Sequence, residues 1–245
     1  MDENEIRKAS QNPFKVKIWA GSHGLKSHYF PQELEKSFTD RGLLRLPEID
    51  AVDGRLLDEN FIDYYRREFE SESYSTIPQV SIILMSDTNI RRHAIKGAFR
   101  AVQAVKELIK IHKDTIHPLL ICGPMPCPRT DQITGILSEH TEDRFQKMIV
   151  RLHKKPTGRF FGYVCVTSFF IQNEFPPLIT SLFARDGIHL NREGAKVLSI
   201  SLVAHANTLV QSVLSYQDID QDDEVYPESE SEDEDEIYQE LLGMS

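Results

Sequence analysis

Residues 16–24 have the sequence VKIWAGSHG, in which a short apolar run passes directly into a turn that contains two glycines. Runs of four to eight β-branched or aromatic residues that end at turn residues predict buried strands. The next stretch, residues 25–39, has the spacing of apolar residues that is typical of a helix. This strand, turn and helix predict the first unit of an α/β fold, with Ser22 just past the end of its first strand.

The same alternation continues along the chain. Further buried strands are predicted at Val80–Met85, His117–Cys122 and Phe161–Val166, and a short or edge strand at Leu46–Val52, which contains a proline and two carboxylates. Helical spacing marks residues 57–70, 91–113, 133–154 and 191–214. The alternation predicts a three-layer α/β/α fold with a five-stranded parallel sheet, in which functional side chains collect beyond the carboxyl ends of the strands.

The negative charge of the chain is concentrated at its C-terminus. The formal net charge is −10, but residues 216–245 hold 13 of the 38 acidic residues and no Lys or Arg, which leaves 25 acidic and 28 basic residues in 1–215. Charges this dense repel one another and cannot bury enough surface to order a segment. We therefore predict a flexible N-terminus over 1–13, one domain over 14–216 and an acidic disordered tail over 217–245.

Composition also indicates which kinds of partner and which cellular location to expect for the protein. The nearly balanced body gives no electrostatic reason for nucleic-acid binding, while the apolar end of the tail, residues 237–244, either only follows a solubilising segment or docks on a protein partner. No apolar segment is long enough for a secretory signal or a membrane span, so we expect an intracellular protein, cytoplasmic or nuclear. Buried thiols, and neither a disulfide framework nor a zinc site, are predicted for Cys122, Cys127 and Cys165.

Two distant stretches carry side chains suited to nucleophilic catalysis. Ser22 at a tight turn would be exposed at the edge of the sheet, where free backbone N–H groups could stabilise an oxyanion. In residues 186–189, DGIH, Asp186 could orient the imidazole of His189 and stabilise the imidazolium that forms during proton transfer. The alternatives are that Ser22 caps a helix and that Asp186 only closes its own loop.

Two more positions could stabilise a developing negative charge. Asn89 follows the third predicted strand, and its side-chain amide could donate a hydrogen bond to an oxyanion. Gly54 follows the second predicted strand, and its N–H could approach a ligand closely. The alternatives are a capping asparagine and an ordinary turn glycine.

Taken together, these residues resemble the SGNH (GDSL-type) hydrolase superfamily over residues 15–214. That family places a Ser after the first strand, a Gly after the second, an Asn after the third and an Asp-x-x-His pair before the last helix. The most specific portion is residues 186–194, DGIHLNREG, which is very like the final block of the family. The proline-rich turn at residues 123–126, GPMP, is also similar, and the chain looks more loosely like SGNH domains encoded by retrotransposons.

The resemblance implies a flavodoxin-like sheet and a serine esterase that acts on small ester or acylated substrates, with no metal or organic cofactor. It implies that Ser22 attacks the carbonyl carbon, that His189 takes and returns the proton, and that Asp186 orients His189. The backbone N–H groups of Ser22 and Gly54, with the side chain of Asn89, would form the oxyanion hole.

The chain departs from the family pattern at three positions. Gly21 stands where the family has Asp, Asp87 where it has Gly before the Asn, and Ile90 where it has Asp after it. A shift of one residue would place His23 at the nucleophile position, although SHG at residues 22–24 favours Ser22. A carboxylate at Asp87 would oppose an oxyanion. The alternative function is therefore a catalytically silent SGNH-fold binding or adaptor domain that recruits a partner through its acidic tail.

Overall fold

The computed structural model describes residues 14–40, 46–73, 79–86, 88–113, 115, 117–128, 147, 160–170 and 180–217. Within these residues, five parallel strands form one sheet in the order β2-β1-β3-β4-β5. The strands are β1 (Lys15–Ala20), β2 (Glu48–Ala51), β3 (Gln79–Leu84), β4 (Leu119–Cys122) and β5 (Phe161–Val164). The predicted five-stranded parallel sheet is confirmed, and the weakest predicted strand is the edge strand β2.

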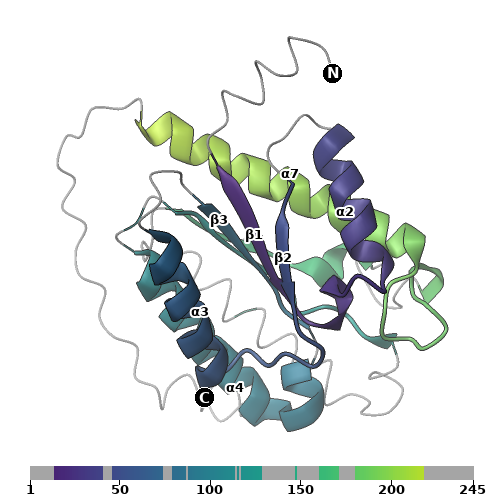
Figure 1. The fold of residues 1–245 in the computed structure, drawn as a ribbon. Helices are drawn as coiled ribbons and strands as arrows, with labels where there is room; N and C mark the ends of the chain where they lie inside the picture. Colours follow the sequence, from purple (N-terminus) through teal and green to yellow (C-terminus); the bar gives the residue numbers. More distant parts are fainter. Residues whose placement is uncertain are drawn as a thin grey trace.

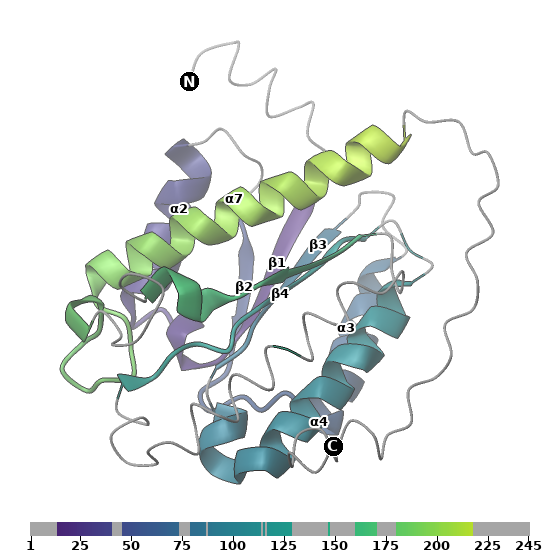
Figure 2. The same ribbon diagram turned by 180° about the vertical axis from the view of Figure 1, so that it is seen from behind.

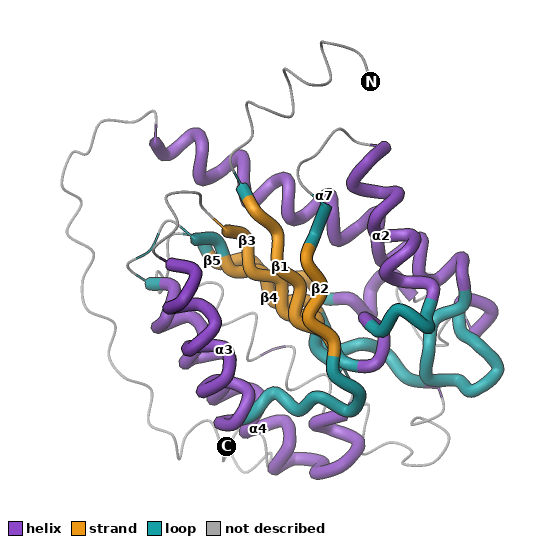
Figure 3. Tube along the Cα trace, viewed as in Figure 1, coloured by secondary structure: helices purple, strands orange, loops and turns teal. Residues whose placement is uncertain are grey.

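Helices cover both faces of the sheet (Figures 1 and 2). On one face lie α2 (Tyr29–Asp40) and α7 (Arg192–Gln217), and on the other lie α3 (Glu59–Ser73) and α4 (Thr88–His112). The sheet is thus the middle one of three layers (Figure 3), which confirms the predicted architecture. None of the described helices offers an apolar stretch long enough to cross a lipid bilayer.

Each strand contributes to two hydrophobic cores because successive side chains point to opposite faces of the sheet. In β1, Val16 and Ile18 pack into the core beneath α2 and α7, whereas Trp19 packs into the core beneath α3 and α4. Burial on both faces explains why the strands appear in the sequence as continuous apolar runs instead of alternating ones.

The bounds of the elements differ by a few residues from the sequence prediction, as at α2 and β5. The helix expected at 25–39 begins only at Tyr29, because Pro31 is compatible with the first turn of a helix but clashes with the preceding turn in its interior. The strand expected at Phe161–Val166 ends at Val164, and the 3₁₀ helix η2 (Val166–Phe170) follows it. Cys122 and Cys127 are buried thiols as expected, while Cys165 is half-buried. The N-terminus 1–13, the helix expected at 133–154 and the tail 218–245 lie outside the described residues, except Lys147.

The order of the strands determines where a site can form. In the order β2-β1-β3-β4-β5, the connection that follows β1 leads to β2 on one side, whereas the connection that follows the neighbouring β3 leads to β4 on the other. In open α/β sheets a crevice forms at such a switch point, outside the carboxyl ends of the strands. Ser22 comes two residues after β1 and therefore lies at this switch point of the sheet.

A buried histidine network lies beneath α3 and α4, beside the start of β4. The Nδ1 atom of His112 donates a hydrogen bond to the carbonyl of His117 (2.6 Å), and its Nε2 atom accepts one from the hydroxyl of Tyr65. The backbone N–H of Gln79 donates to Nδ1 of His117 (2.9 Å). An N–H group can only donate, so His117 must be uncharged here. Burial lowers the pKa of His112 from its usual 6.5 to about 4 and also lowers that of His117.

We predict that the free energy of unfolding decreases as the pH falls from 7 to 4. The folded-state pKa of each histidine lies below its unfolded value, so the unfolded chain binds more protons in this range. For His112 the loss is on the order of 3 kcal/mol, at about 1.4 kcal/mol per pKa unit. Urea denaturation at a series of pH values measures it.

The variant His117→Asn provides the matched comparison. Its side-chain oxygen can accept the hydrogen bond from Gln79 but does not titrate, so the decrease with pH should become shallower. The exposed His205, changed to Asn in the same way, is the control for the substitution itself. An identical slope in wild type and His117→Asn would show that His117 does not contribute to the pH dependence.

Candidate active site

The turn that carries Ser22 is packed tightly on the ends of two strands. Ser22–Gly24 forms a 3₁₀ turn in which the N–H of Gly24 donates to the carbonyl of Gly21 (3.0 Å). A Cβ on Gly24 would lie 2.7 Å from Cβ of Ala20 at the end of β1 and 2.9 Å from Cβ of Ala51 at the end of β2. Only glycine fits at this distance, so the turn is fixed directly over both strand ends.

Gly21 shows how closely the neighbouring connections approach Ser22. A Cβ at Gly21 would lie 3.4 Å from the side chain of Ser86, which follows β3, and 4.0 Å from the carbonyl of Val52, which follows β2. The residue before Ser22 therefore lies between the ends of β2 and β3, so the connections after all three strands meet around Ser22.

The turn that carries Asp186 and His189 is held by the carboxylate of Asp186. Its Oδ1 atom accepts hydrogen bonds from the backbone N–H groups of Ile188 (2.9 Å) and His189 (3.0 Å). Gly187 has φ +64°, a left-handed conformation that glycine adopts without strain. Asn191 then caps α7, because its Oδ1 accepts the N–H of Gly194 (3.0 Å). Helix α7 therefore fixes this turn at its C-terminal side.

The structure joins the three residues from the two distant stretches by hydrogen bonds. Nδ1 of His189 lies 2.7 Å from Oδ2 of Asp186, and Nε2 of His189 lies 3.0 Å from Oγ of Ser22, 167 residues away in the chain. A carboxylate accepts, so Nδ1 of a neutral His189 carries the proton and Nε2 is left to accept the proton of Ser22. The arrangement can therefore draw a proton from the hydroxyl of Ser22 toward Nε2 of His189.

The surroundings keep Asp186 negatively charged. Partial burial alone would raise its pKa, but the hydrogen bonds from the His189 ring and from the N–H groups of Ile188 and His189 lower it to about 2. The side chain of Asp186 is 41% exposed and that of His189 20% exposed, so the pair faces solvent. The carboxylate is thus ionised throughout the neutral range beside the imidazole that it orients.

The turn that carries Gly54 is braced by an ion pair on an aromatic surface. Gly54 has φ +63° in the turn after β2. The guanidinium of Arg55 contacts Asp50 of β2 at Oδ1 (2.6 Å) and at the carbonyl (2.9 Å), and Tyr64 donates to the other carboxylate oxygen (2.8 Å). The same guanidinium lies over the rings of Phe61 and Tyr64, at 5.4 and 6.0 Å from their centres. The turn with Gly54 is therefore held firmly against β2.

Asn89 is the second residue of α4, next to the connection that follows β3. Its side chain, that of Ile90, and the whole of Asp87 lie outside the described part of the structure. The hydroxyl of Ser86 donates to Oγ1 of Thr88 (2.7 Å) and accepts the N–H of Thr88 (3.3 Å), which caps the start of α4. The contribution of Asn89 to an oxyanion hole stays a prediction.

Sequence reasoning missed two imidazoles beside His189. The ring of His28 stacks on that of His189, with centres 4.1 Å apart and planes at 14°. His23 was considered only as a competing position for the nucleophile. Its buried ring lies 5.3 Å from that of His189 and donates from Nε2 to the carbonyl of Ile188 (3.1 Å). The sequence shows only that His23, His28 and His189 lie in or near the two predicted turns. It does not indicate the direction in which each ring points.

Burial and the neighbouring His189 lower the pKa of both rings. The pKa of His23 falls from its usual 6.5 to about 4, and that of His28 is also lowered. Both are therefore uncharged at neutral pH. Among the described residues, no group of three His, Cys, Asp or Glu side chains is arranged to hold a metal ion.

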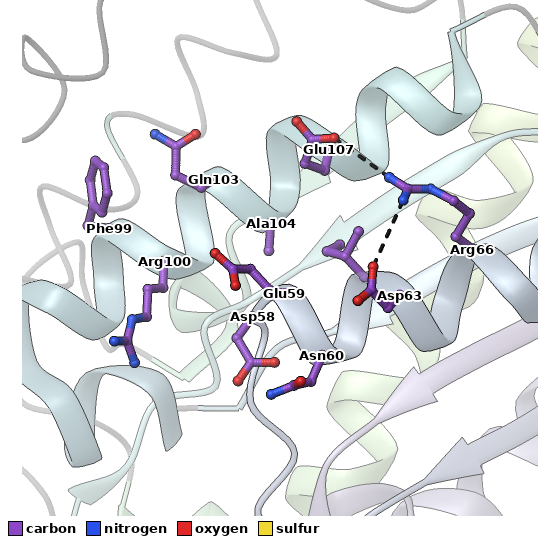
Figure 4. A pocket seen from close by; sticks show the side chains of 11 residues that line it. Asp58, Glu59, Asn60, Asp63, Arg66, Phe99, Arg100, Gln103, Ala104 and Glu107 are labelled. Atoms are coloured by element: carbon purple, nitrogen blue, oxygen red, sulfur yellow. Dashed lines mark ion pairs between the residues drawn. The ribbon is translucent and has the colours of Figure 1, made fainter.

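A separate pocket of about 600 Å³ lies between α3 and α4 (Figure 4). Its charged side chains partly neutralise one another, since Arg66 pairs with Asp63 (3.9 Å) and with Glu107 (3.8 Å). It is lined by neither Ser22 nor His189, so it is distinct from the site at the end of β1.

The fold of the chain is similar to that of several solved lipases and esterases. No protein-family model and no curated protein sequence matches the chain. Among solved structures it is similar to a GDSL-like lipase from Bacteroides thetaiotaomicron (14% identity, TM-score 0.54, covering 85% of this chain and 97% of the other). It is also similar to a carbohydrate acetylesterase from Sinorhizobium meliloti (11%, 0.53, 80% and 99%) and to a lipase from a goat rumen metagenome (14%, 0.56, 78% and 97%). The chain therefore has the SGNH hydrolase fold, as its resemblance to that family implied.

We predict that Gly194→Ala destabilises the protein and displaces His189. A Cβ at Gly194 would lie 2.1 Å from the carbonyl oxygen of Leu182, a backbone atom that cannot rotate away. Relief would require the start of α7 to move from the turn Thr180–Leu182, at a cost of about 3 kcal/mol. Urea denaturation measures this cost. Gly21→Ala is the matched control with a cost below about 1 kcal/mol, since its Cβ would make ordinary contacts. Equal stability of the two variants would contradict the close approach of α7.

Proposed function

We propose that this protein is a serine hydrolase of the SGNH type that cleaves small esters through an acyl-enzyme. The observation that carries the proposal is the continuous hydrogen-bonded chain from Ser22 through His189 to Asp186 at the switch point of the sheet. A nucleophile, a base and a group that orients the base are the parts that serine hydrolysis requires.

In the proposed reaction, Oγ of Ser22 attacks the carbonyl carbon of the ester and its proton passes to Nε2 of His189. The ionised Asp186 stabilises the imidazolium that results. His189 then returns the proton to the leaving alcohol as the ester C–O bond breaks, which leaves an acyl group on Ser22. A water molecule then attacks the acyl carbon while His189 takes its proton. His189 returns this proton to Oγ of Ser22 as the acyl bond breaks, which releases the carboxylic acid and free Ser22.

The proposed oxyanion hole consists of the N–H groups of Ser22 and Gly54 and the side chain of Asn89. Its support is positional, since these residues follow β1, β2 and β3 and the connections after those strands meet around Gly21. The loss of one such donor typically lowers the rate by about 10²–10³. In the sequence, the three departures from the family pattern, Gly21, Asp87 and Ile90, are within two residues of Ser22 or Asn89.

Small esters are the proposed substrates because the Asp186–His189 pair is open to solvent, and because lipases and a carbohydrate acetylesterase share the fold. The competing function, a catalytically silent adaptor, would not need the Ser22 hydroxyl to be placed on His189. Recruitment of a protein partner by residues 217–245 stays a prediction, since residues 218–245 lie outside the described ones. The intracellular location also stays a prediction from the sequence.

We expect a fluorophosphonate probe to label the full-length protein at Ser22, with loss of fluoride and formation of a bond from Oγ to phosphorus. Ser22→Ala should reduce labelling to background, and His189→Ala should slow it at least about 100-fold, because the hydroxyl then lacks its base. Mass spectrometry of the labelled peptide identifies the residue. Ser27→Ala, an exposed serine in the same segment, is the control and should be labelled as fast as wild type. Failure to label a folded wild-type sample would reject the hydrolase.

We expect Asp186→Asn to lower kcat/KM for p-nitrophenyl acetate by about 10²–10⁴. The amide oxygen can still accept the two backbone N–H groups, but the amide nitrogen would face Nδ1 of His189 and favour the tautomer that carries its proton on Nε2. Glu193→Gln, an exposed carboxylate in the first turn of α7, should retain wild-type activity. Activity that survives Asp186→Asn undiminished would exclude this role for Asp186.

A further inference from the structure

The ring of His28 lies closer to the ring of His189 than that of His23 does. The two imidazoles are nearly parallel, at 14°, and their centres lie 4.1 Å apart. No step of the proposed reaction uses His28, and its position in the chain, six residues after Ser22, did not single it out.

The hydrogen bonds of His189 are sensitive to the tilt of its ring. They hold Nδ1 on Asp186 and Nε2 on Ser22, and rotation of the ring about its Cβ–Cγ bond moves both atoms out of line with these partners. Tilting weakens both hydrogen bonds, because each depends on the direction of its donor or lone pair. A flat neighbour on the face of the ring restricts this tilt.

The segment that carries Ser22 also positions His28. The N–H of Leu25 donates to the carbonyl of Ser22 (3.0 Å), and the N–H of His28 donates to the carbonyl of Leu25 (2.9 Å). Two consecutive turns thus lead from Ser22 to His28 just before α2 begins at Tyr29. The segment that begins at Ser22 thereby places the ring of His28 against one face of the His189 ring.

We propose that His28 is a positioning residue for His189, and that its uncharged imidazole face both fixes the plane of His189 and stabilises the imidazolium formed during proton transfer. The role in proton transfer rests on the proposed function. The face of an uncharged aromatic ring carries partial negative charge and attracts a cation placed over it.

The charges around His28 agree with this role. His189, Asp186 and Asp53 are the charged or titratable groups that act on it, and burial followed by the proximity of His189 lowers the pKa of His28. His28 is therefore uncharged at neutral pH, when His189 accepts the proton. On the backbone side, His23 holds the carbonyl of Ile188, the residue before His189, so the two imidazoles restrain different parts of the same turn.

The test compares two substitutions of similar size on the full-length protein. His28→Phe keeps a flat uncharged ring, whereas His28→Leu fills the space without one. We expect the rate constant for fluorophosphonate labelling of Ser22 to fall about 10-fold in His28→Leu and to stay within about threefold of wild type in His28→Phe. His205→Leu, a change of an exposed histidine far along α7, is the control and should label like wild type.

A second readout does not depend on catalysis. In long-range ¹H–¹⁵N spectra of protein with ¹⁵N-labelled histidine, wild-type His189 should show a single tautomer with the proton on Nδ1. His28→Leu should broaden or shift the Nε2 signal of His189, and His28→Phe should not. Thermal unfolding followed by circular dichroism checks that the variants remain folded.

The two readouts separate the failure of each proposal. If the probe does not label the wild type but His28→Leu disturbs the His189 signal, the hydrolase is rejected and the positioning contact stands. If the probe labels wild type and His28→Leu equally fast and the His189 signal is unchanged, the role of His28 is overturned and the hydrolase stands. If His28→Phe loses labelling as His28→Leu does, the flat ring face is not what positions His189.

Discussion

The parallel direction of the strands is the constraint on which the site depends. Because β1, β2 and β3 all run the same way, their carboxyl ends meet at one rim, and the turns that follow them converge around Gly21 and Ser22. The base comes from the far end of the chain, where Asn191 caps α7 directly after His189. Helix α7 packs along α2 and reaches the sheet, and this packing brings Nε2 of His189 to Oγ of Ser22. The site is thus assembled by the way one helix docks on a sheet.

The sequence contained the strands, the layers and the two turns of the site, because these are local patterns. An apolar run that ends at glycine indicates a buried strand, and the spacing of Asp186 and His189 lets them meet within one turn whatever surrounds them. The late start of α2 could also have been read from Pro31. The stacking of His28 on His189 could not be predicted from the sequence. It depends on two turns after Ser22 and on the docking of α7, and no local sequence pattern indicates either of them.

The two halves of the site differ in how far they follow the family pattern. The half that would move the proton has its three family residues joined by hydrogen bonds, with Asp186 ionised. In the sequence, the departures at Gly21, Asp87 and Ile90 are next to residues proposed for the oxyanion hole. In the proposed reaction the two halves would perform separate tasks, since an activated hydroxyl can attack without a full oxyanion hole at a rate that the missing donors reduce. A change in one half therefore need not abolish the contribution of the other.

The ion pair between Arg55 and Asp50 affects how well the turn with Gly54 could stabilise an oxyanion. It lies over the rings of Phe61 and Tyr64 and holds the turn with Gly54 against the edge strand, with Tyr64 on the second carboxylate oxygen. A backbone dipole that is already oriented when charge develops need not reorganise, whereas water would have to turn toward the new charge at that moment. The aromatic rings of α3 would thus keep the backbone N–H of Gly54 oriented in the proposed oxyanion hole.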